Sequence, residues 1–384
     1  MNFTIKIFAI AISLGALASQ ASAFNSDHDF QIHQEYTSTR ALGMGNAYVA
    51  VVDDHSSLFY NPAALALRKD TQLRMFLRAG ADKDVVSFYN DIKNAGKDDN
   101  KINAAIEKNY QDHLYFRAPT LGAVLVRPHW GLAILPVDFD VDLALHRSVA
   151  ASIFVNAYLD STVAWGYGNF VQVPWFNNKK YPVAVGATVK FLHRAYYSDV
   201  IQSAEIASGQ DLVSLTNAEE GGTVDVDMGA LYTVPVADDA KIKPSFGLMV
   251  RNVIDEGFPI KMRFLNKNAS PPPRLQRRLD VGTKLGLPTF WVFDPKIAFD
   301  VRDIGYDSWT PMKGLHAGAE LYWKMYNWWK GHWSVGINQG YWTAGFGARM
   351  AIFQLDLASW GEEVGTTDAK HESRRYILEA SLDF

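Results

Sequence analysis

Apolar and polar residues alternate one by one along most of this chain, and the alternation continues to its last residue. In residues 181–191 one set of positions is apolar, and the positions between them hold small, polar or charged residues. The last stretch shows the same pattern at Tyr376, Leu378, Ala380, Leu382 and Phe384. Successive side chains of a β-strand point to opposite faces, so the pattern predicts strands with one apolar and one polar face.

Fourteen such stretches follow one another from residue 71 to the C-terminus. An even number is typical of a single-chain barrel whose two ends lie on the same side of a membrane. The fourth stretch could be divided at Asp160, but its alternation keeps one phase from Val149 to Trp165, and we count it as one strand. The expected strands are 71–80, 119–127, 130–138, 148–165, 182–192, 223–234, 244–253, 277–287, 295–303, 314–324, 332–339, 341–349, 351–358 and 374–384.

The first residues have the pattern of a secretory signal peptide. Lys6 gives a basic start, residues 7–17 are apolar, and Ala21, Ser22 and Ala23 are the small residues typical of a cleavage site. We expect cleavage near Ala23, and therefore an exported protein.

Both a soluble β-fold and a transmembrane barrel are compatible with the alternation. The export signal, the 13% content of aromatic residues and the strand that ends at Phe384 favour the membrane. After the leader there is no apolar run long enough for a transmembrane helix. We predict an all-β fold, a transmembrane antiparallel β-barrel of about 14 strands, in the outer membrane of a Gram-negative bacterium.

The strand count also assigns the connections to the two sides of the membrane. Segments 81–118, 193–222, 254–276 and 359–373 fall on the extracellular side, together with a tight turn at 339–341, whereas 166–181 is periplasmic. Within 82–111, apolar residues recur at helical spacing on both sides of Gly96. This spacing predicts two short helices, which we expect to cover the barrel mouth.

A compact apolar stretch stands between the leader and the strands. Asn61 is a good helix cap and Pro62 suits the first helical position, so a short helical turn is expected there. Gly43 and Gly45 lack a β-carbon and allow close contact with a wall. We predict that this stretch plugs the lumen. The expected organisation is a signal peptide at 1–23, an N-terminal arm and hatch at 24–70, and an outer-membrane β-barrel at 71–384.

The order of these features resembles a known family. Arg40-Ala41-Leu42-Gly43-Met44-Gly45, followed by Asp53-Asp54 and Asn61-Pro62-Ala63, resembles the N-terminal hatch of the FadL superfamily of outer-membrane transport proteins. The leader, about 14 strands, a late hairpin at 341–357 and the terminal Phe384 also occur in family order. The resemblance implies a barrel of the FadL/TodX type, gated by hatch residues Gly43, Gly45, Asn61 and Pro62.

The resemblance further implies passive uptake of hydrophobic small molecules such as long-chain fatty acids, with a lateral exit through the wall. Apolar loop residues are the candidates for ligand binding, although they could instead pack on one another. These residues are Phe88, Tyr89, Phe258, Ile260, Met262 and Phe264. FadL-like barrels also include non-transporting accessory or scaffold proteins of secretion or conjugation systems, and this alternative stays open.

The expected partners follow from the same interpretation. They are outer-membrane lipids, a hydrophobic small-molecule ligand and the outer-membrane assembly machinery, which would recognise the C-terminal strand ending at Phe384. A net charge of -4 gives no reason to expect nucleic acid as a partner.

We find no pattern that indicates an enzyme or a cofactor. The chain lacks G-x-S-x-G, H-E-x-x-H and Walker-type sequences, and its scattered histidines suit loops and strand ends better than a hydrolase site. It has no cysteine, which removes thiolate metal sites. His28, Asp29 and His33 could form a metal site, but we favour a solvated arm. We therefore predict no catalytic residues, no metal and no cofactor.

Charged residues occupy the polar face of many strands and are expected to face the lumen. We favour a ladder of paired charges that stiffens the interior and anchors the hatch. Alternatively, a subset binds a ligand carboxylate. The residues are Arg74, Arg78, Lys190, Asp225, Asp227, Arg251, Arg278, Asp280, Lys284, Lys296, Asp300, Arg302, Glu320, Arg349 and Asp356.

Overall fold

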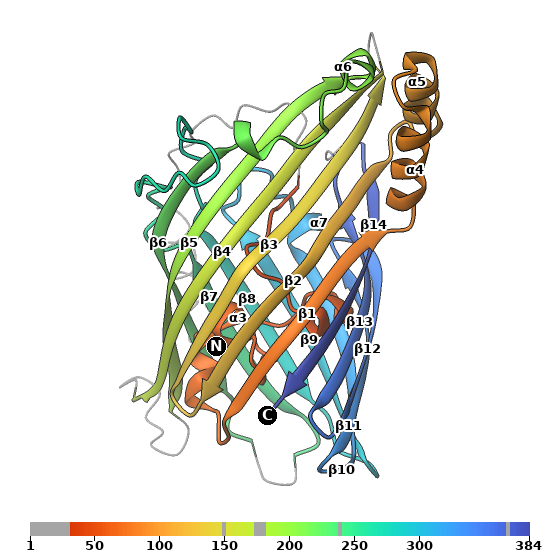
Figure 1. The fold of residues 1–384 in the computed structure, drawn as a ribbon. Coiled ribbons are helices and arrows are strands. Elements are labelled where there is room, and N and C mark those ends of the chain that lie inside the picture. The colour runs from red at the N-terminus through yellow and green to blue at the C-terminus, as the bar shows by residue number, and fades with distance from the viewer. Residues whose placement is uncertain (1–30, 148–150, 173–181, 237–239, 366–368) are drawn as a thin grey trace.

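A computed structural model describes residues 31–147, 151–172, 182–236, 240–365 and 369–384 (Figure 1). The leader expected at 1–23 lies outside these residues. The described chain contains fourteen strands. They are β1 (Gln72–Asp82), β2 (His113–Arg127), β3 (Trp130–Arg147), β4 (Ala151–Val171), β5 (Val183–Gln202), β6 (Glu219–Thr233), β7 (Lys243–Arg251), β8 (Arg278–Gly286), β9 (Phe293–Ile304), β10 (Leu315–Tyr326), β11 (Trp329–Asn338), β12 (Tyr341–Met350), β13 (Phe353–Glu363) and β14 (Glu372–Asp383).

The strands form one closed antiparallel barrel in which each strand pairs with its neighbours in the sequence. β1 pairs with β14, from Arg74 opposite Asp383 to Asp82 opposite Arg375, and this pairing closes the sheet. Closure leaves no open sheet edge in the barrel. The predicted fold class, the count of fourteen strands and the undivided fourth strand are confirmed.

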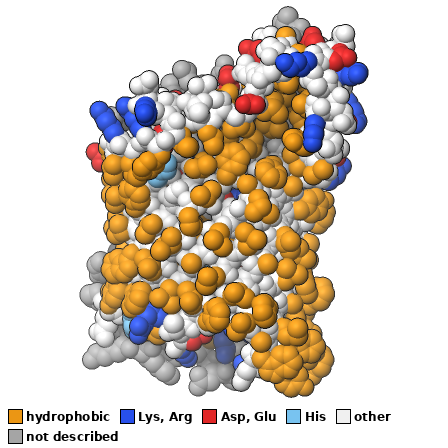
Figure 2. Space-filling model, in the orientation of Figure 1, with side chains coloured by type: hydrophobic (Ala, Val, Ile, Leu, Met, Phe, Trp, Pro, Cys, Tyr) orange, Lys and Arg blue, Asp and Glu red, His pale blue; other side chains and the backbone are white. Residues whose placement is uncertain are grey.

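The two faces of the wall differ as the alternation predicts. On β14, Arg375, Ile377 and Glu379 are buried, whereas the outward-facing Tyr376 and Leu378 are exposed. Figure 2 shows apolar side chains over the outward face of the strands, with charged side chains gathered mainly towards the two ends of the barrel. A continuous apolar band on the outside of a closed barrel is the surface that a lipid bilayer covers.

The helices are short. They are α2 (Thr39–Gly43), α3 (Ser57–Tyr60), α4 (Val85–Ala95), α5 (Asp99–Lys108), α6 (Ser203–Ser208) and α7 (Pro311–Gly314), with 3-10 turns η1 (Pro62–Ala66) and η3 (Leu215–Asn217). In the described part of the chain, no helix is long and apolar enough to cross a membrane.

The barrel is much taller on one side. β4 and β5 have 21 and 20 residues, whereas β7 and β8 have 9 each. The predicted helices α4 and α5 are present, separated at Gly96. They do not cover the mouth as expected, because Phe88, Ile102 and Ile106 pack on the outward side of the tall strands, against residues such as Ile153. The apolar residues there, beyond the membrane band, need this cover.

The expected bounds of β2, β3 and β5 are wrong. β2 begins at His113 instead of 119, β3 continues to Arg147 instead of 138, and β5 continues to Gln202 instead of 192, so the loop expected at 193–222 is shorter. Pro119 and Pro136 lie inside β2 and β3, and each of these two strands shifts phase beside its proline, so the alternation read from the sequence breaks there. A proline normally marks the end of a central strand, which explains the errors in β2 and β3.

Residues 31–70, here called the N-terminal segment, lie inside the barrel (Figure 1). The segment contains α2, α3 and η1 and supplies most of the largest buried apolar cluster, including Tyr48, Leu58 and Leu65. Wall residues such as Phe76 and Leu135 complete this cluster. The lumen at this level is therefore filled by side chains of the chain's own N-terminal part.

Candidate functional site

The two glycines predicted in the hatch lie against the wall with no room for a side chain. A β-carbon at Gly43 would lie 2.6 Å from Ser334 Oγ and 2.7 Å from Gly345 Cα. Gly45 has a φ of +65°, and its β-carbon would collide with the carbonyl oxygen of Ala317. Such a backbone conformation and such contacts favour glycine. α2 therefore rests directly on the wall formed by β11, β12 and β13.

Asn61 and Pro62 fix a second part of the segment to the wall. Asn61 Oδ1 accepts a hydrogen bond from Ala63 N at 3.2 Å, and Pro62 begins η1, in agreement with the predicted helical turn. Asn61 Nδ2 also donates to the carbonyl oxygens of Ala230 at 3.2 Å and Leu248 at 3.4 Å, on β6 and β7. One side chain thus caps the turn and attaches it to two strands.

Glycines on the facing strands make room for this turn. A β-carbon at Gly186 would collide with the backbone of Pro62, and one at Gly229 would collide with Asn61. Because the colliding groups at Gly186 are backbone atoms of a packed turn, a larger residue requires the turn to move.

We expect Gly186→Leu to destabilise the folded barrel, since overpacking a filled interior costs about 1–3 kcal/mol. The temperature at which the purified protein loses its folded migration on a denaturing gel should fall. Gly286→Leu is the matched control, because a β-carbon there would lie 3.5 Å from its nearest neighbour, the carbonyl oxygen of Lys243. An equal fall in both variants would argue against a tight seat for η1.

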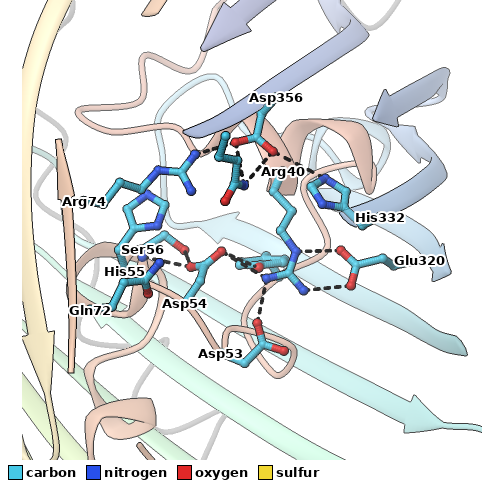
Figure 3. A network of polar contacts seen from close by, with 12 residues as sticks. Arg40, Asp53, Asp54, His55, Ser56, Gln72, Arg74, Glu320, His332 and Asp356 are labelled. Atoms are coloured by element: carbon cyan, nitrogen blue, oxygen red, sulfur yellow. Dashed lines mark hydrogen bonds and ion pairs between the residues drawn. The ribbon is translucent and has the colours of Figure 1, made fainter. Parts of the chain in front are cut away.

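Arg40 links the segment to the wall through an ion cluster that is buried at Glu320 and exposed at Asp53 (Figure 3). Its Nε donates to Glu320 Oε2 at 2.6 Å and its Nη2 to Glu320 Oε1 at 2.7 Å. Its Nη1 donates to Asp53 at 2.7 Å and to Asp54 at 3.2 Å. Lys296 Nζ lies 2.9 Å from Glu320 and 3.0 Å from Asp53. Two cations and three carboxylates therefore join the N-terminal segment to β9 and β10.

The carboxylate of Asp54, in the turn that follows Asp53, stays charged. Burial alone would raise the pKa of Asp54, but the neighbouring His55, the Arg40 charge and the hydrogen bonds from Ser56 hold that pKa well below its usual range. Burial, together with the Arg74 charge, lowers the pKa of His55 to about 4. Near neutral pH Asp54 is therefore an anion that can pair with Arg40, whereas His55 is neutral.

Most of the charged residues predicted to face the lumen are buried and contact each other or the N-terminal segment. The ion pairs are Arg74 with Asp356, Arg78 with Asp138, Lys190 with Asp227, Arg251 and Arg302 with Asp280, Arg278 with Glu35, Lys296 with Glu320, and Arg349 with Asp383. Asp225 accepts hydrogen bonds from the backbone N–H groups of Ile254 and Asp255, and Asp300 accepts them from Tyr48 and Val49. Lys284 is partly buried on β8.

These contacts leave little free charge at the level of the N-terminal segment. Buried charges need such partners, because an unpaired charge in this setting is costly. The arrangement therefore favours the ladder of paired charges over an open carboxylate-binding site.

The hydrogen-bonded wall is interrupted between β2 and β3. Residues 118–122 and 135–139, all within the described part of the chain, form no ladder pair with each other. The ladder is intact on both sides, up to Arg117 with Asp140 and again from Ala123 with Ile134. Proline has no N–H to donate, so Pro119 and Pro136 weaken the pairing at this place.

Asp138 lies at the lumen side of this interruption. It contacts wall residues directly, and two of these residues also contact the N-terminal segment. Its Oδ2 accepts from Arg78 Nη2 at 2.7 Å, and its Oδ1 accepts from Thr120 Oγ1 at 3.0 Å. Arg117 Nε lies 2.9 Å from Asp138 Oδ1. The same two arginines donate to Thr37, Arg117 to its hydroxyl at 2.9 Å and Arg78 to its carbonyl oxygen. Segment and interruption are therefore parts of one polar network.

The predicted ligand-binding residues divide into two groups. Phe88 is buried between α4 and the tall strands, and Phe258 is buried against Leu192. Met262 is partly buried. In contrast, Tyr89, Ile260 and Phe264 are exposed, and Phe264 is 72% exposed. The structure thus brings no single cluster together from these six residues.

Several residues at these contacts were not among the sequence candidates. Arg117, Asp138, Thr37 and Glu35 are examples, and their partners are distant in the sequence. The signal that was available is the pair of strand prolines at 119 and 136. Of the proposed metal ligands, His28 and Asp29 lie outside the described residues. His33 stacks on Tyr158 at 3.7 Å inside the barrel, so the expected solvated arm is wrong for its described part.

Comparison with known proteins gives matches among solved structures alone. No protein-family model matches the chain, and a search of curated proteins finds no match. One similar structure is the "TodX deltaS2S3 mutant monoaromatic hydrocarbon channel", with 11% identity, a TM-score of 0.48, and 90% of this chain and 98% of that chain covered.

Two other similar structures belong to Pseudomonas proteins. The Pseudomonas aeruginosa FadL homologue has 10% identity and a TM-score of 0.44, with 93% of this chain and 99% of that chain covered. The P. putida toluene transporter TodX has 10% identity and a TM-score of 0.42, with 90% and 97% covered. At such low identities and scores, the fold rests on this chain's own strand order and pairing.

Proposed function

We propose that this barrel mediates passive uptake of hydrophobic small molecules across the outer membrane, with long-chain fatty acids as the first class to test. The N-terminal segment is the gate, and the ligand leaves sideways between β2 and β3. No chemical step is involved.

The interrupted β2–β3 ladder is the observation that supports this proposal. An otherwise closed wall is unpaired where Pro119 and Pro136 lie, and the exposed Leu121 and Val137 make the outside of this place apolar. Separating two strands where they form no backbone ladder pairs costs less than breaking an intact ladder. An apolar molecule that leaves here passes into lipid and avoids an aqueous path.

The contacts of Asp138 suggest how the gate and the exit are coupled. Arg78 and Arg117 bind both Asp138 and Thr37, so movement of the N-terminal segment removes partners from the residues beside the interruption. The segment also fills the lumen, which closes the direct route through the barrel. Lateral exit and gating by the segment are thus two parts of one rearrangement.

Uptake of a labelled long-chain fatty acid by cells tests the proposal. Cells with the wild-type protein should take up more label than cells without it, and the double variant Asn61→Ala and Pro62→Ala should lose this gain. Asn61→Ala removes the hydrogen bonds that attach η1 to β6 and β7, and Pro62→Ala removes the proline that begins this turn. The variant must first be shown to be assembled, by its altered migration on a denaturing gel before boiling.

Equal uptake in all three strains would exclude long-chain fatty acids as the substrate. The accessory or scaffold interpretation would then be tested by isolating the barrel and identifying bound protein partners.

A further inference from the structure

A large apolar groove lies on the membrane-facing side of the wall. Its volume is about 970 Å³, and it crosses β1, β14, β13, β12 and β11. This volume is at the upper end of the range of about 300–1,000 Å³ that is typical of small-molecule sites. The proposed uptake route does not by itself require such a groove.

Two neighbouring rows of outward-facing residues give the groove its shape. The row nearer the periplasm is large, with Leu357 opposite Leu378 and Phe346, and Phe346 opposite Trp333. In the next row Ala344 and Ser359 are opposite each other and form a low floor. In this row the two small residues lie between Val335 and Tyr376, so they form a short ledge beside the large row, on which part of an alkyl chain can lie.

The groove begins at the interruption in the wall. Its edge on β2 is formed by Phe116 and Pro119, and Pro119 is one of the residues that lack a ladder partner on β3. From there it passes Ala79 and Ala81 on β1 and continues across β14. A molecule that leaves between β2 and β3 therefore meets this groove first.

A cation lies just beyond the extracellular edge of the groove, outside the residues that line it. Arg374 is the outward-facing residue before Tyr376 on β14. Its guanidinium lies 4.0 Å from the centre of the Trp342 ring. Nη1 donates to the carbonyl oxygen of Trp342 at 2.7 Å, and Nη2 contacts Glu372. Because Nη2 is buried, the donors left for a carboxylate headgroup are Nε and the second N–H of Nη1.

We infer that this groove is a binding site on the membrane face for a long-chain fatty acid, with its alkyl chain on the ledge and its carboxylate near Arg374. The inference rests on the proposed function for the identity of the occupant. It adds a site that receives the ligand outside the barrel, where the uptake route ends.

Quenching of Trp333 fluorescence can test this site at equilibrium, without transport. The purified protein is placed in lipid nanodiscs with either a brominated long-chain fatty acid or a phospholipid with brominated chains. The signal of Trp333 is the difference between the wild type and Trp333→Phe. Half-maximal quenching by the fatty acid should require a mole fraction about tenfold lower than by the phospholipid.

Two substitutions on the outward face separate the site from the bilayer. Ala344→Phe fills the floor of the groove and should remove the preference for the fatty acid. Ala380→Phe is the control, because Ala380 also faces outward but lies outside the groove. The methyl ester of the brominated fatty acid, which lacks the carboxylate, should quench Trp333 more weakly than the acid. In Arg374→Gln, quenching by the acid should fall towards that of the ester.

Equal quenching by fatty acid and phospholipid would overturn the inference and would indicate ordinary contact with bilayer lipid. A preference that survives Ala344→Phe would overturn it as well. The uptake measurement in cells is independent of both outcomes. Loss of the preference with normal uptake would reject the groove alone, and absence of uptake with the preference retained would reject the transport function alone.

Discussion

A disulfide that closes the β2–β3 interruption should reduce uptake of the fatty acid to the level of cells without the protein. The double variant Leu121→Cys and Pro136→Cys places the two thiols opposite each other in the register that the flanking pairs define. The chain has no cysteine of its own, so no other thiol competes. A disulfide forms only when the two Cα atoms are within about 7 Å, and it then fixes the two strands together.

The experiment compares uptake by the same double variant in its oxidised and in its reduced form. Uptake should be lost after oxidation and should return after a reducing agent, with the fraction of crosslinked protein measured by mass spectrometry. Pro136→Cys alone controls for the loss of the proline. The pair Ala123→Cys and Ile134→Cys places a disulfide in the intact ladder of the same strands and should leave uptake unchanged. Full uptake by completely crosslinked protein would reject the lateral exit.

The strand prolines also show how far the sequence predicts this wall. Strand number, strand order and the inward and outward faces follow from the period of two, because a slip of one residue would place charged residues in lipid. The phase shifts beside Pro119 and Pro136 interrupt that period, and the bounds of β2 and β3 were lost with it. This irregular part of the wall was therefore predicted poorly, and it is where we place the exit.

The residues of the gate also differ in how well the sequence predicts them, because some depend on local structure and others on partners that are distant in the sequence. Gly43, Gly45, Asn61 and Pro62 are recognisable from the sequence because backbone conformation and helix capping are local properties. The partner of Arg40 cannot be recognised in this way, since Glu320 lies 280 residues away in the sequence. Alternation predicts that Glu320 faces the lumen, but it does not predict which cation it meets.

Our last prediction uses this distant pair. Arg40→Met should open the barrel to ions, because it removes the side chain that joins the N-terminal segment to Glu320 on the wall and that also binds Asp53 and Asp54 within the segment. Breaking a buried ion pair by removing one partner costs about 3–5 kcal/mol. If this cost falls on the seated state of the segment, the ratio of open to closed barrels rises more than about a hundredfold.

Conductance of the purified barrel in a planar lipid bilayer measures this ratio. The wild type should be mostly closed and Arg40→Met mostly open. Lys69→Met is the matched control, because Lys69 is exposed just after η1 and its loss leaves the ion cluster intact. Glu320→Gln should also raise conductance, since it removes the charge of the wall carboxylate that both Arg40 and Lys296 contact. A barrel that stays closed in both variants would mean that the seats of α2 and η1 hold the segment without the ion cluster, and Arg40 would then not be part of the gate.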